Sequence, residues 1–384
     1  MNRLCIYVTY NKEFKIEAYV GYMLKALREH TTTLYVVCNY PHILDGKEYV
    51  EPYADEIFYR ENRGYDAGAY KDMLCTIIGW DKIYQYDELV LLNDSFFGPF
   101  YNLIDCFDLM DDVNCDFWGM TQHPAGEFKA LGYRFESHIQ SYFLVFRSQV
   151  LKNSLFKEFW GNFTYPNTFT ETIINFEIGI NLCLKKNGFI PKALTDVWGM
   201  IFKENQNPTF YHALELIRDK GLPILKKKIF MICNRRFENA MNAVDFLQTN
   251  ELYPIEWIWE WIDRQFYIED YAADGDNCLD AFRQKYKKVY IYGAGVCGKN
   301  LRLYFERKGW KEEGIIVSDL AGQDIDCIAF DDVNIDEETG IVVSVIDREA
   351  SGEIEQYISS KCSKGQLFFL SDCTAVQQYH LHLR

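Results

Sequence analysis

Residues 88–99 read Glu88-Leu-Val-Leu-Leu-Asn-Asp-Ser-Phe-Phe-Gly-Pro99, and the first 235 residues can be arranged around this stretch. Its apolar run, Leu89 to Leu92, predicts a short strand that a parallel sheet buries on both faces. Asn93-Asp94-Ser95 would then stand at the carboxyl end of the strand, where open α/β sheets bind ligands. A carboxylate between an amide and a hydroxyl can hold a divalent cation and its phosphates. The alternative is a helix cap, because Asp and Ser are favoured N-cap residues.

Composition narrows the class of protein. With 384 residues, of which 48% are apolar, the chain is long enough for roughly two or three domains with sizeable cores. A net charge of −16 argues against a nucleic-acid binder, because phosphate contacts need clustered Lys and Arg. The 12 cysteines are scattered singly, several within apolar runs, which indicates reduced thiols. No stretch has the length of a signal or spanning segment, so we expect a cytoplasmic protein, free or at the inner face of the membrane.

The N-terminus shows a β-α-β pattern typical of a doubly wound sheet. Residues 4–9 and 34–38 predict strands, and residues 14–29 have apolar side chains at helical spacing. The loop after the first strand contains Thr9 and Tyr10, and we expect it to hold a nucleotide base. It contains no glycine-rich phosphate loop. This absence argues against a dinucleotide fold and favours a nucleotide-sugar fold that holds the diphosphate through a metal.

A second polar loop follows a short strand predicted over residues 56–59 and enters the same edge of the sheet. It reads Glu61-Asn-Arg-Gly-Tyr-Asp-Ala-Gly-Ala-Tyr-Lys71. Its glycines would allow close approach of a ligand, its basic side chains would neutralise phosphate, and its acid would accept hydrogen bonds from sugar hydroxyls. The alternative is a turn into a helix capped by the acid. The residues expected to bind substrate here are Asn62, Arg63, Gly64, Asp66, Gly68 and Lys71.

Several motifs resemble the rhamnan synthesis protein F family. They are the loop just described, Leu91-Leu-Asn-Asp-Ser-Phe-Phe-Gly-Pro99, Asp116-Phe-Trp-Gly-Met-Thr121, His138-Ile-Gln-Ser-Tyr-Phe-Leu-Val-Phe146 and the later segments Asn207-Pro-Thr-Phe and Gly221-Leu-Pro-Ile-Leu-Lys226. The resemblance covers about residues 1–235. It implies an α/β glycosyltransferase of the type A fold, which uses a nucleotide sugar to build rhamnose-rich or related polysaccharides of the cell surface or cell wall. That fold carries a metal signature of two aspartates where Asn93-Asp94-Ser95 stands, and this sequence keeps one.

The resemblance also implies an acceptor, a glycan or lipid-linked glycan, and a divalent cation, Mg²⁺ or Mn²⁺. Asp94 and His212 are the expected metal ligands, although a histidine on a helix is more commonly buried. Inverting transfer needs a general base, for which Glu177 is the candidate. Glu171 is the alternative base, and a helix-surface role for Glu177 is equally open.

Three further features concern the acceptor side and the charge of the site. Gln140, with nearby Tyr142, is placed to contact sugar, whereas Trp118 would stack on a sugar or pack in the core. Lys226 begins the densest basic run of an acidic chain. This run, Lys226-Lys227-Lys228, together with Arg235-Arg236, would bind or steer the anionic donor or a lipid-diphosphate acceptor, unless it is a solvated face.

The C-terminal part carries a different motif, Lys288-Val-Tyr-Ile-Tyr-Gly-Ala-Gly-Val-Cys-Gly298. A strand, a complete G-x-G-x-x-G and a helix, followed by an acid about 20 residues on, form the dinucleotide fingerprint. We therefore expect a glycosyltransferase domain over residues 1–235, a helical connector over 236–284 and a Rossmann-like domain over 285–384. The alternative function is a glycan-recognition protein with an NAD(P)-binding or regulatory module, or a module whose glycines serve only packing. The expected cofactor-binding residues are Gly293, Gly295, Gly298 and Asp319.

Overall fold

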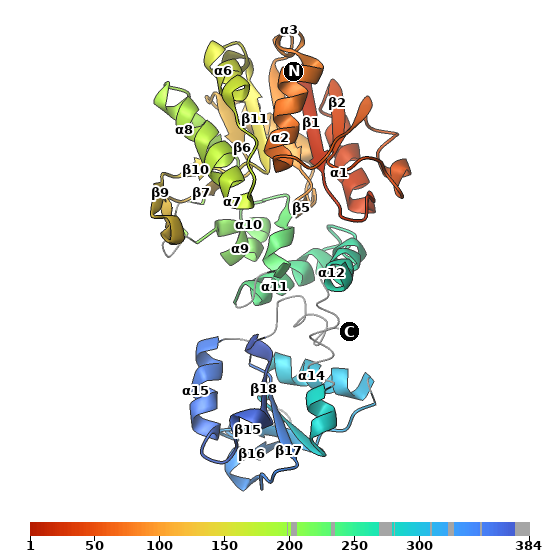
Figure 1. Ribbon diagram of the computed structural model, residues 1–384, viewed down its shortest axis with the longest axis vertical. Helices are drawn as coiled ribbons and strands as arrows, with labels where there is room; N and C mark the ends of the chain where they lie inside the picture. The colour runs from red at the N-terminus through yellow and green to blue at the C-terminus, as the bar shows by residue number, and fades with distance from the viewer. Residues whose placement is uncertain are drawn as a thin grey trace. The chain divides into compact units, whose positions relative to one another are not determined.

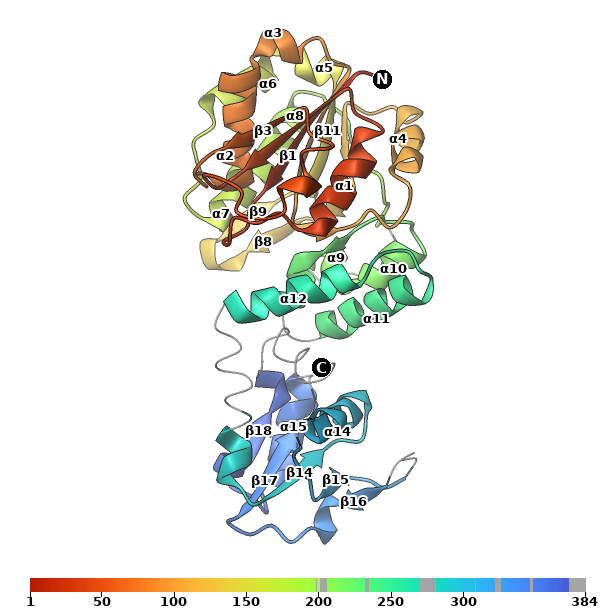
Figure 2. The same ribbon diagram turned by 90° about the vertical axis from the view of Figure 1, so that its right-hand side faces the viewer.

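The computed structural model describes residues 1–197, 199–200, 206–231, 235–268, 279, 281–307, 309–321, 326–345 and 348–372. The chain divides into two compact units, which Figures 1 and 2 show from two sides. The first unit comprises residues 1–227 and 242–254, and the second comprises residues 228–241 and 255–384. The predicted domain boundaries near residues 235 and 285 stay predictions.

A seven-stranded mixed sheet forms the centre of the first unit, in the order β12-β6-β11-β4-β1-β2-β3. β4 pairs in parallel with β1, and β11 runs antiparallel between β4 and β6. The predicted α/β class is confirmed, with the mixed, mostly parallel sheet that the resemblance implied. The strands are β1 (Arg3–Thr9), β2 (Thr33–Cys38), β3 (Glu56–Tyr59), β4 (Glu88–Asn93), β6 (Phe117–Gly119), β11 (Phe143–Arg147) and β12 (Pro191–Ala193).

Three two-stranded sheets complete the strands of this unit. They pair β5 (Phe96–Phe97) with β13 (Leu225–Lys226), β7 (Gln122–His123) with β10 (His138–Ile139), and β8 (Gly126–Phe128) with β9 (Tyr133–Phe135). The first pair is important for the site. It joins Leu225–Lys226 to the segment that follows β4, although the two segments lie more than a hundred positions apart in sequence.

Helices cover both faces of the seven-stranded sheet, with α2, α6 and α8 together on one face in Figure 1. On the other face, α1 contacts β2, and Phe107 of α4 packs its ring against Phe143 of β11. The helices of this unit are α1 (Ala18–Arg28), α2 (Tyr65–Asp72), α3 (Trp80–Ile83), α4 (Leu103–Asp111), α5 (Ser148–Leu151), α6 (Ser154–Asn162), α7 (Phe169–Thr172), α8 (Gly179–Lys186), α9 (Pro208–Tyr211) and α10 (Ala213–Arg218). Helix α11 (Arg235–Thr249) has residues in both units, and α12 (Glu256–Ile268) belongs to the second.

Two of these helices are extended by π-helical turns, α2 by Met73–Ile78 and α7 by Ile173–Ile178, which leads directly into α8. Short 3₁₀ turns cover Lys47–Tyr49, Lys129–Leu131 and Lys227–Met231. The helix predicted over 14–29 begins only at Ala18. Phe14 has a positive φ of 56°, and Ile16 donates its backbone N–H to Asp45 instead of continuing a helix.

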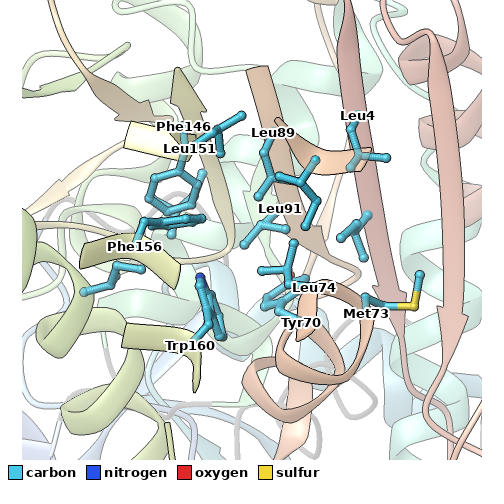
Figure 3. Packing of buried hydrophobic residues seen from close by; sticks show 14 of the residues in the cluster. Leu4, Tyr70, Met73, Leu74, Leu89, Leu91, Phe146, Leu151, Phe156 and Trp160 are labelled. Atoms are coloured by element: carbon cyan, nitrogen blue, oxygen red, sulfur yellow. The ribbon is translucent and has the colours of Figure 1, made fainter. Parts of the chain in front are cut away.

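The core beneath β4 explains why the apolar run predicts the fold. Leu89 and Leu91 point to the same face of the sheet, as alternate residues of a strand must, and both are fully buried. Figure 3 shows them among Tyr70 of α2 and Phe156 and Trp160 of α6. Side chains of α2 and α6 therefore fix the position and rotation of β4 in the sheet. They thereby also fix the position of the polar residues at its end.

The second unit contains a five-stranded parallel sheet in the order β16-β15-β14-β17-β18. The chain moves from β14 to one side and then crosses to the other, so β14 is the switch point of the sheet. The predicted Rossmann-like α/β class of this part is confirmed. Its elements are β14 (Lys288–Tyr292), α14 (Val296–Arg307), β15 (Gly314–Val317), β16 (Cys327–Ala329), β17 (Thr339–Val343), α15 (Arg348–Ile358) and β18 (Leu367–Phe369), with 3₁₀ turns at Phe330–Asp332, Lys364–Gln366 and Leu370–Asp372.

Candidate active site

Asp94 lies directly after β4, beside the end of β1. Its Oδ2 accepts hydrogen bonds from Thr9 Oγ1 at 2.9 Å and from the backbone N–H of Tyr10 at 3.4 Å. Nζ of Lys227 lies 3.9 Å from the same oxygen, and only 9% of the Lys227 side chain and 15% of the Asp94 side chain are exposed. The next element is β5, and the nearest following helix, α4, is capped by Asn102. The alternative in which Asp94 caps a helix is therefore wrong.

Asn93 connects the end of β4 to the loop that follows β3. Its Nδ2 donates to Oδ2 of Asp66 at 2.6 Å, and its Oδ1 accepts from both N and Oγ of Ser95. Asp66 lies in the first turn of α2, whose N-cap is Gly64, so Asp66 is not a helix cap. Burial raises the pKa of Asp66, although hydrogen bonds from Asn93 and Ala67 partly offset this effect. The two polar loops expected at this edge of the sheet are in direct contact.

Lys226 reaches the same cluster from β13. Its Nζ donates to Oγ of Ser95 at 2.7 Å and lies 4.2 Å from the ring centroid of Tyr142. The hydroxyl of Tyr142 and Oε1 of Gln140 both contact Oγ1 of Thr121 at 2.7 Å. Gln140 is thus linked to the site through Thr121 and Tyr142. Its own side chain is buried and engaged with protein, so its contact with sugar stays a prediction.

Glu177 lies in the π-helical segment between α7 and α8, a type of turn that is frequent at functional sites. Its Oε1 faces Nε2 of His138 at 3.2 Å, and its Oε2 accepts from N and Oγ of Ser141 at 2.7 Å each. Burial alone would raise the pKa of Glu177, but the hydrogen bond and charge of His138 and the hydrogen bonds from Ser141 outweigh it and lower the pKa to about 2. The carboxylate is therefore well suited to hold the segment between β10 and β11.

The glycines of the second loop are explained by packing. Gly64 has a φ of 75°, and a Cβ there would lie 2.9 Å from the ring of Tyr165. A Cβ on Gly68 would lie 2.2 Å from the backbone oxygen of Arg63. Both glycines are needed to form the loop itself. Close approach of a ligand to them stays a prediction.

The basic side chains of this loop contact protein groups. Lys71 donates to the backbone oxygens of Gly161 and Phe163, at the end of α6. The guanidinium of Arg63 lies 4.3 Å from the ring centroid of Tyr165. The side chains of Asn62 and Tyr10 are exposed at the surface. The positive charge beside Ser95 and Asp94 therefore comes from Lys226 and Lys227, which the strand pairing of β13 delivers.

The predicted metal ligands do not form a metal-binding group. His212, at the junction of α9 and α10, contacts the carboxylate of Glu215 through Nδ1. Within the described ranges of the chain, no three His, Cys, Asp or Glu side chains are arranged to hold a metal. Oδ2 of Asp94 already accepts two hydrogen bonds and faces an ammonium group, which would repel a divalent cation placed beside it. These residues do not fit a divalent cation.

Comparison with known proteins shows which family this chain belongs to. The model of the family described as rhamnan synthesis protein F matches residues 34–288. This chain belongs to the rhamnan synthesis protein F family. Among curated proteins, this family member is 25% identical to uncharacterized protein y4gN of Sinorhizobium fredii (strain NBRC 101917 / NGR234), over 40% of this chain and 38% of that protein. It is 24% identical to virulence protein VirA of Vibrio anguillarum (strain ATCC 68554 / 775), over 50% of this chain and 70% of VirA.

Among solved structures, this family member resembles core-mannan synthase A from Aspergillus fumigatus in its Mn/GDP form, with 10% sequence identity. The likeness covers 41% of this chain and 63% of that chain, with a TM-score of 0.21, which is too low to support an argument. In the parts of the chain that the structure describes, helices long and apolar enough to cross a membrane are absent.

The glycine fingerprint of the second unit lies between β14 and α14. Gly293 has a φ of 109°, and a Cβ on Gly298 would lie 1.8 Å from the backbone oxygen of Gly293, so residue 298 must be glycine for the loop to close. Gly295 has no neighbouring atom within 4 Å of such a Cβ position. Asp319 follows β15, is exposed, and accepts the N–H of Ala321 at 2.9 Å. The loop lies at the switch point of its sheet, where ligands bind in such folds.

The sequence indicated Lys227 only as a member of the basic run 226–228, and it did not indicate a site role for Tyr19 or Thr121. Lys227 donates to the hydroxyl of Tyr19, on α1, as well as facing Asp94. The run Lys226-Lys227-Lys228 is visible in the sequence, but the burial of its middle member is not. That burial follows from the end of β13 and the start of a 3₁₀ turn at Lys227, which turns Lys228 outward.

Proposed function

We propose that the first unit transfers a sugar, rhamnose or a similar hexose, from a nucleotide sugar to a glycan or lipid-linked glycan acceptor in the synthesis of a cell-surface polysaccharide. The observation that carries this proposal is the cluster of Asp66, Asn93, Asp94, Ser95 and Lys226 at the carboxyl end of β4. At such an edge, ammonium groups suit the diphosphate of a nucleotide sugar, and carboxylates suit the hydroxyls of its sugar. Membership of the rhamnan synthesis protein F family supports the same chemistry.

In this proposal, the loop of Thr9 and Tyr10 contacts the nucleotide, and Asp66, which Asn93 holds in place, accepts a hydrogen bond from a sugar hydroxyl. The acceptor approaches from the side of Gln140 and Tyr142. With inversion, the acceptor oxygen bonds to the anomeric carbon as the bond to the diphosphate breaks, and the acceptor proton passes to a carboxylate. The predicted base is Glu177. Burial raises the pKa of Asp66, whereas that of Glu177 is lowered to about 2, so Asp66 binds a proton more strongly and is the stronger candidate.

A panel of UDP-, GDP- and dTDP-sugars, screened against the full chain by thermal shift, tests the proposal. A donor that binds the native state raises its stability by about 2.7 kcal/mol at a hundred times Kd. We expect one nucleotide class to raise the melting temperature and to be hydrolysed or transferred in the presence of acceptor glycans. Binding of glycans alone, with no response to any nucleotide sugar, would favour the glycan-recognition alternative.

We also propose that residues 285–384 bind a nucleotide or nucleotide sugar without converting it. The position of the glycine loop at the switch point next to β14 supports this second function. The predicted cytoplasmic location and contact with the membrane surface or with a polysaccharide-synthesis complex stay predictions.

A further inference from the structure

Two lysine side chains lie at the place where the type A fold carries its metal signature. Lys226 contacts Ser95 and Lys227 faces Asp94, the two positions that follow Asn93 at the end of β4. We propose that these two ammonium groups bind the diphosphate of the donor in place of a divalent cation, so that transfer by this protein needs no metal. This inference rests on the proposed glycosyltransferase function and names the groups that stabilise its leaving group.

The surroundings of Lys227 hold its ammonium group at the strand end. Its Nζ donates to the hydroxyl of Tyr19 and lies 4.1 Å from the ring centroid of Tyr19 and 5.7 Å from that of Phe97. Aromatic faces attract a cation without neutralising its charge. The distance of 3.9 Å to Oδ2 of Asp94 is too long for a hydrogen bond. The charge of Lys227 is thus oriented toward the strand end from a largely buried position.

Lys226 is held at the same strand end by a different set of groups. Ser95 Oγ accepts its hydrogen bond, and the ring of Tyr142 lies against its ammonium group. An ammonium group beside a hydroxyl and an aromatic ring can still form a charge-assisted hydrogen bond with phosphate.

The side chains that could act as metal ligands at this strand end also argue against a bound divalent cation. Asn93 stands where the type A signature has its first aspartate, and the carboxamide of Asn93 is used by Asp66 and Ser95. A Mg²⁺ ion bound to Asp94 would lie about 2.1 Å from the carboxylate oxygen and therefore within a few ångströms of the Lys227 ammonium. Two ammonium groups already supply the formal charge of one Mg²⁺.

These groups account for the bonds, electrons and proton of the sugar-transfer step. The acceptor oxygen forms a bond to the anomeric carbon, and the bond from that carbon to the diphosphate oxygen breaks. The bonding electron pair stays on the diphosphate, and the acceptor proton moves to a carboxylate of the site. Negative charge therefore grows on the leaving oxygen, and preorganised cations at that place stabilise the transition state.

The test uses the full chain and three nucleotides, UDP, GDP and dTDP, titrated by calorimetry with EDTA and again with Mg²⁺ or Mn²⁺. We expect the nucleotide that binds to have the same Kd in all three conditions. Lys226→Met and Lys227→Met should each weaken its binding by about 10- to 100-fold, the value of a charge-assisted hydrogen bond. Binding of the corresponding nucleoside, which has no phosphates, should be weakened little by these substitutions. Lys226→Arg, which keeps the charge, should bind better than Lys226→Met.

Lys228→Met is the matched control, because Lys228 belongs to the same basic run but is exposed, and its nucleotide binding should be unchanged. If Lys227→Met does not fold, the two Lys226 variants still decide the question. Binding that requires Mg²⁺ or Mn²⁺ and survives both methionine substitutions overturns the lysine proposal and leaves the glycosyltransferase function standing. A wild-type chain that binds none of the three nucleotides, with or without metal, overturns the proposed function itself.

Discussion

At the scale of single residues, Asp66 and Glu177 are two carboxylates of the candidate active site with opposite surroundings. Burial raises the pKa of Asp66, whereas hydrogen bonds from His138 and Ser141 overcome burial and lower that of Glu177. We predict that Asp66→Asn cuts kcat by about 10²- to 10⁴-fold, the usual contribution of a general base, and removes the acidic limb of the pH–rate profile. Glu177→Gln should keep that limb, with a smaller loss of activity.

Steady-state rates across pH for both variants provide the measurement, with donor Kd as the control for binding. A Glu177→Gln enzyme that loses the acidic limb, next to an Asp66→Asn enzyme that retains it, would return the role of base to Glu177.

The low pKa of Glu177 also predicts a pH dependence of stability. The carboxyl has an ordinary pKa of 4.5 and a folded pKa of about 2, so the folded state favours its ionised form. The resulting stabilisation, about 3 kcal/mol, is complete above the unfolded pKa and is lost as pH falls from about 5 toward 2. Urea unfolding of wild type and Glu177→Gln should therefore differ most near neutral pH and converge in acid. A difference that is independent of pH would show that Glu177 does not carry the effect.

At the scale of elements, β4 is the strand on which the site depends. Leu91 is fully buried between the helices of one face, and truncating it leaves a cavity that the neighbouring rings cannot fill. We predict that Leu91→Ala lowers the free energy of unfolding by about 2–5 kcal/mol. Ile77→Ala, at a position 46% exposed, should change it by less than about 0.5 kcal/mol. Urea denaturation monitored by tryptophan fluorescence measures both, and equal effects of the two substitutions would contradict the assignment of Leu91 to the core.

The strands of the sheet could be predicted because their apolar runs are long enough to carry a pattern. Strands over 4–9, 34–38, 56–59 and 89–92 match β1 to β4 within one residue. The pair of β5 and β13 could not be predicted, since strands of two residues have no periodicity. The side chain of Asn153 caps α6, so that α5 and α6 are separate helices.

The same distinction separates the predicted and unpredicted parts of the site. Asn93 and Asp94 could be selected because a polar residue at the end of a buried run is visible in the sequence, and Asp66 because it lies in a loop with two glycines and two basic residues. The position of Lys227 could not, because it depends on the antiparallel register of Lys226 opposite Phe96. Likewise, the sequence allows Trp118 to be a sugar platform, with core packing as the default interpretation, and only the structure shows that it is fully buried against Phe107 and Phe143.

At the scale of the whole molecule, the chain joins two α/β units whose sheets place polar loops at strand ends by different means. In the first unit, side chains supply the charge at the end of β4. In the second unit, the glycine loop after β14 offers its backbone in place of charged side chains, and Asp319 is the acid beyond β15. Since the two sheets are separate, a ligand of one unit need not depend on the binding residues of the other.

This separation leads to the prediction that the full chain binds NAD or a related nucleotide through its second unit, without turnover. In folds of this type, the acid after the second strand accepts a hydrogen bond from the ribose 2′-hydroxyl, and it repels a 2′-phosphate. Calorimetry should therefore show tighter binding of NAD than of NADP, and Asp319→Asn should weaken NAD by about tenfold, as expected for one hydrogen bond to a charged group. Lys226→Met should leave this binding unchanged, because Lys226 belongs to the first unit. The tight contact between positions 293 and 298 already requires glycine for packing. If no dinucleotide and no nucleotide sugar of the panel shows binding that depends on Asp319, the glycines of residues 293–298 serve packing alone.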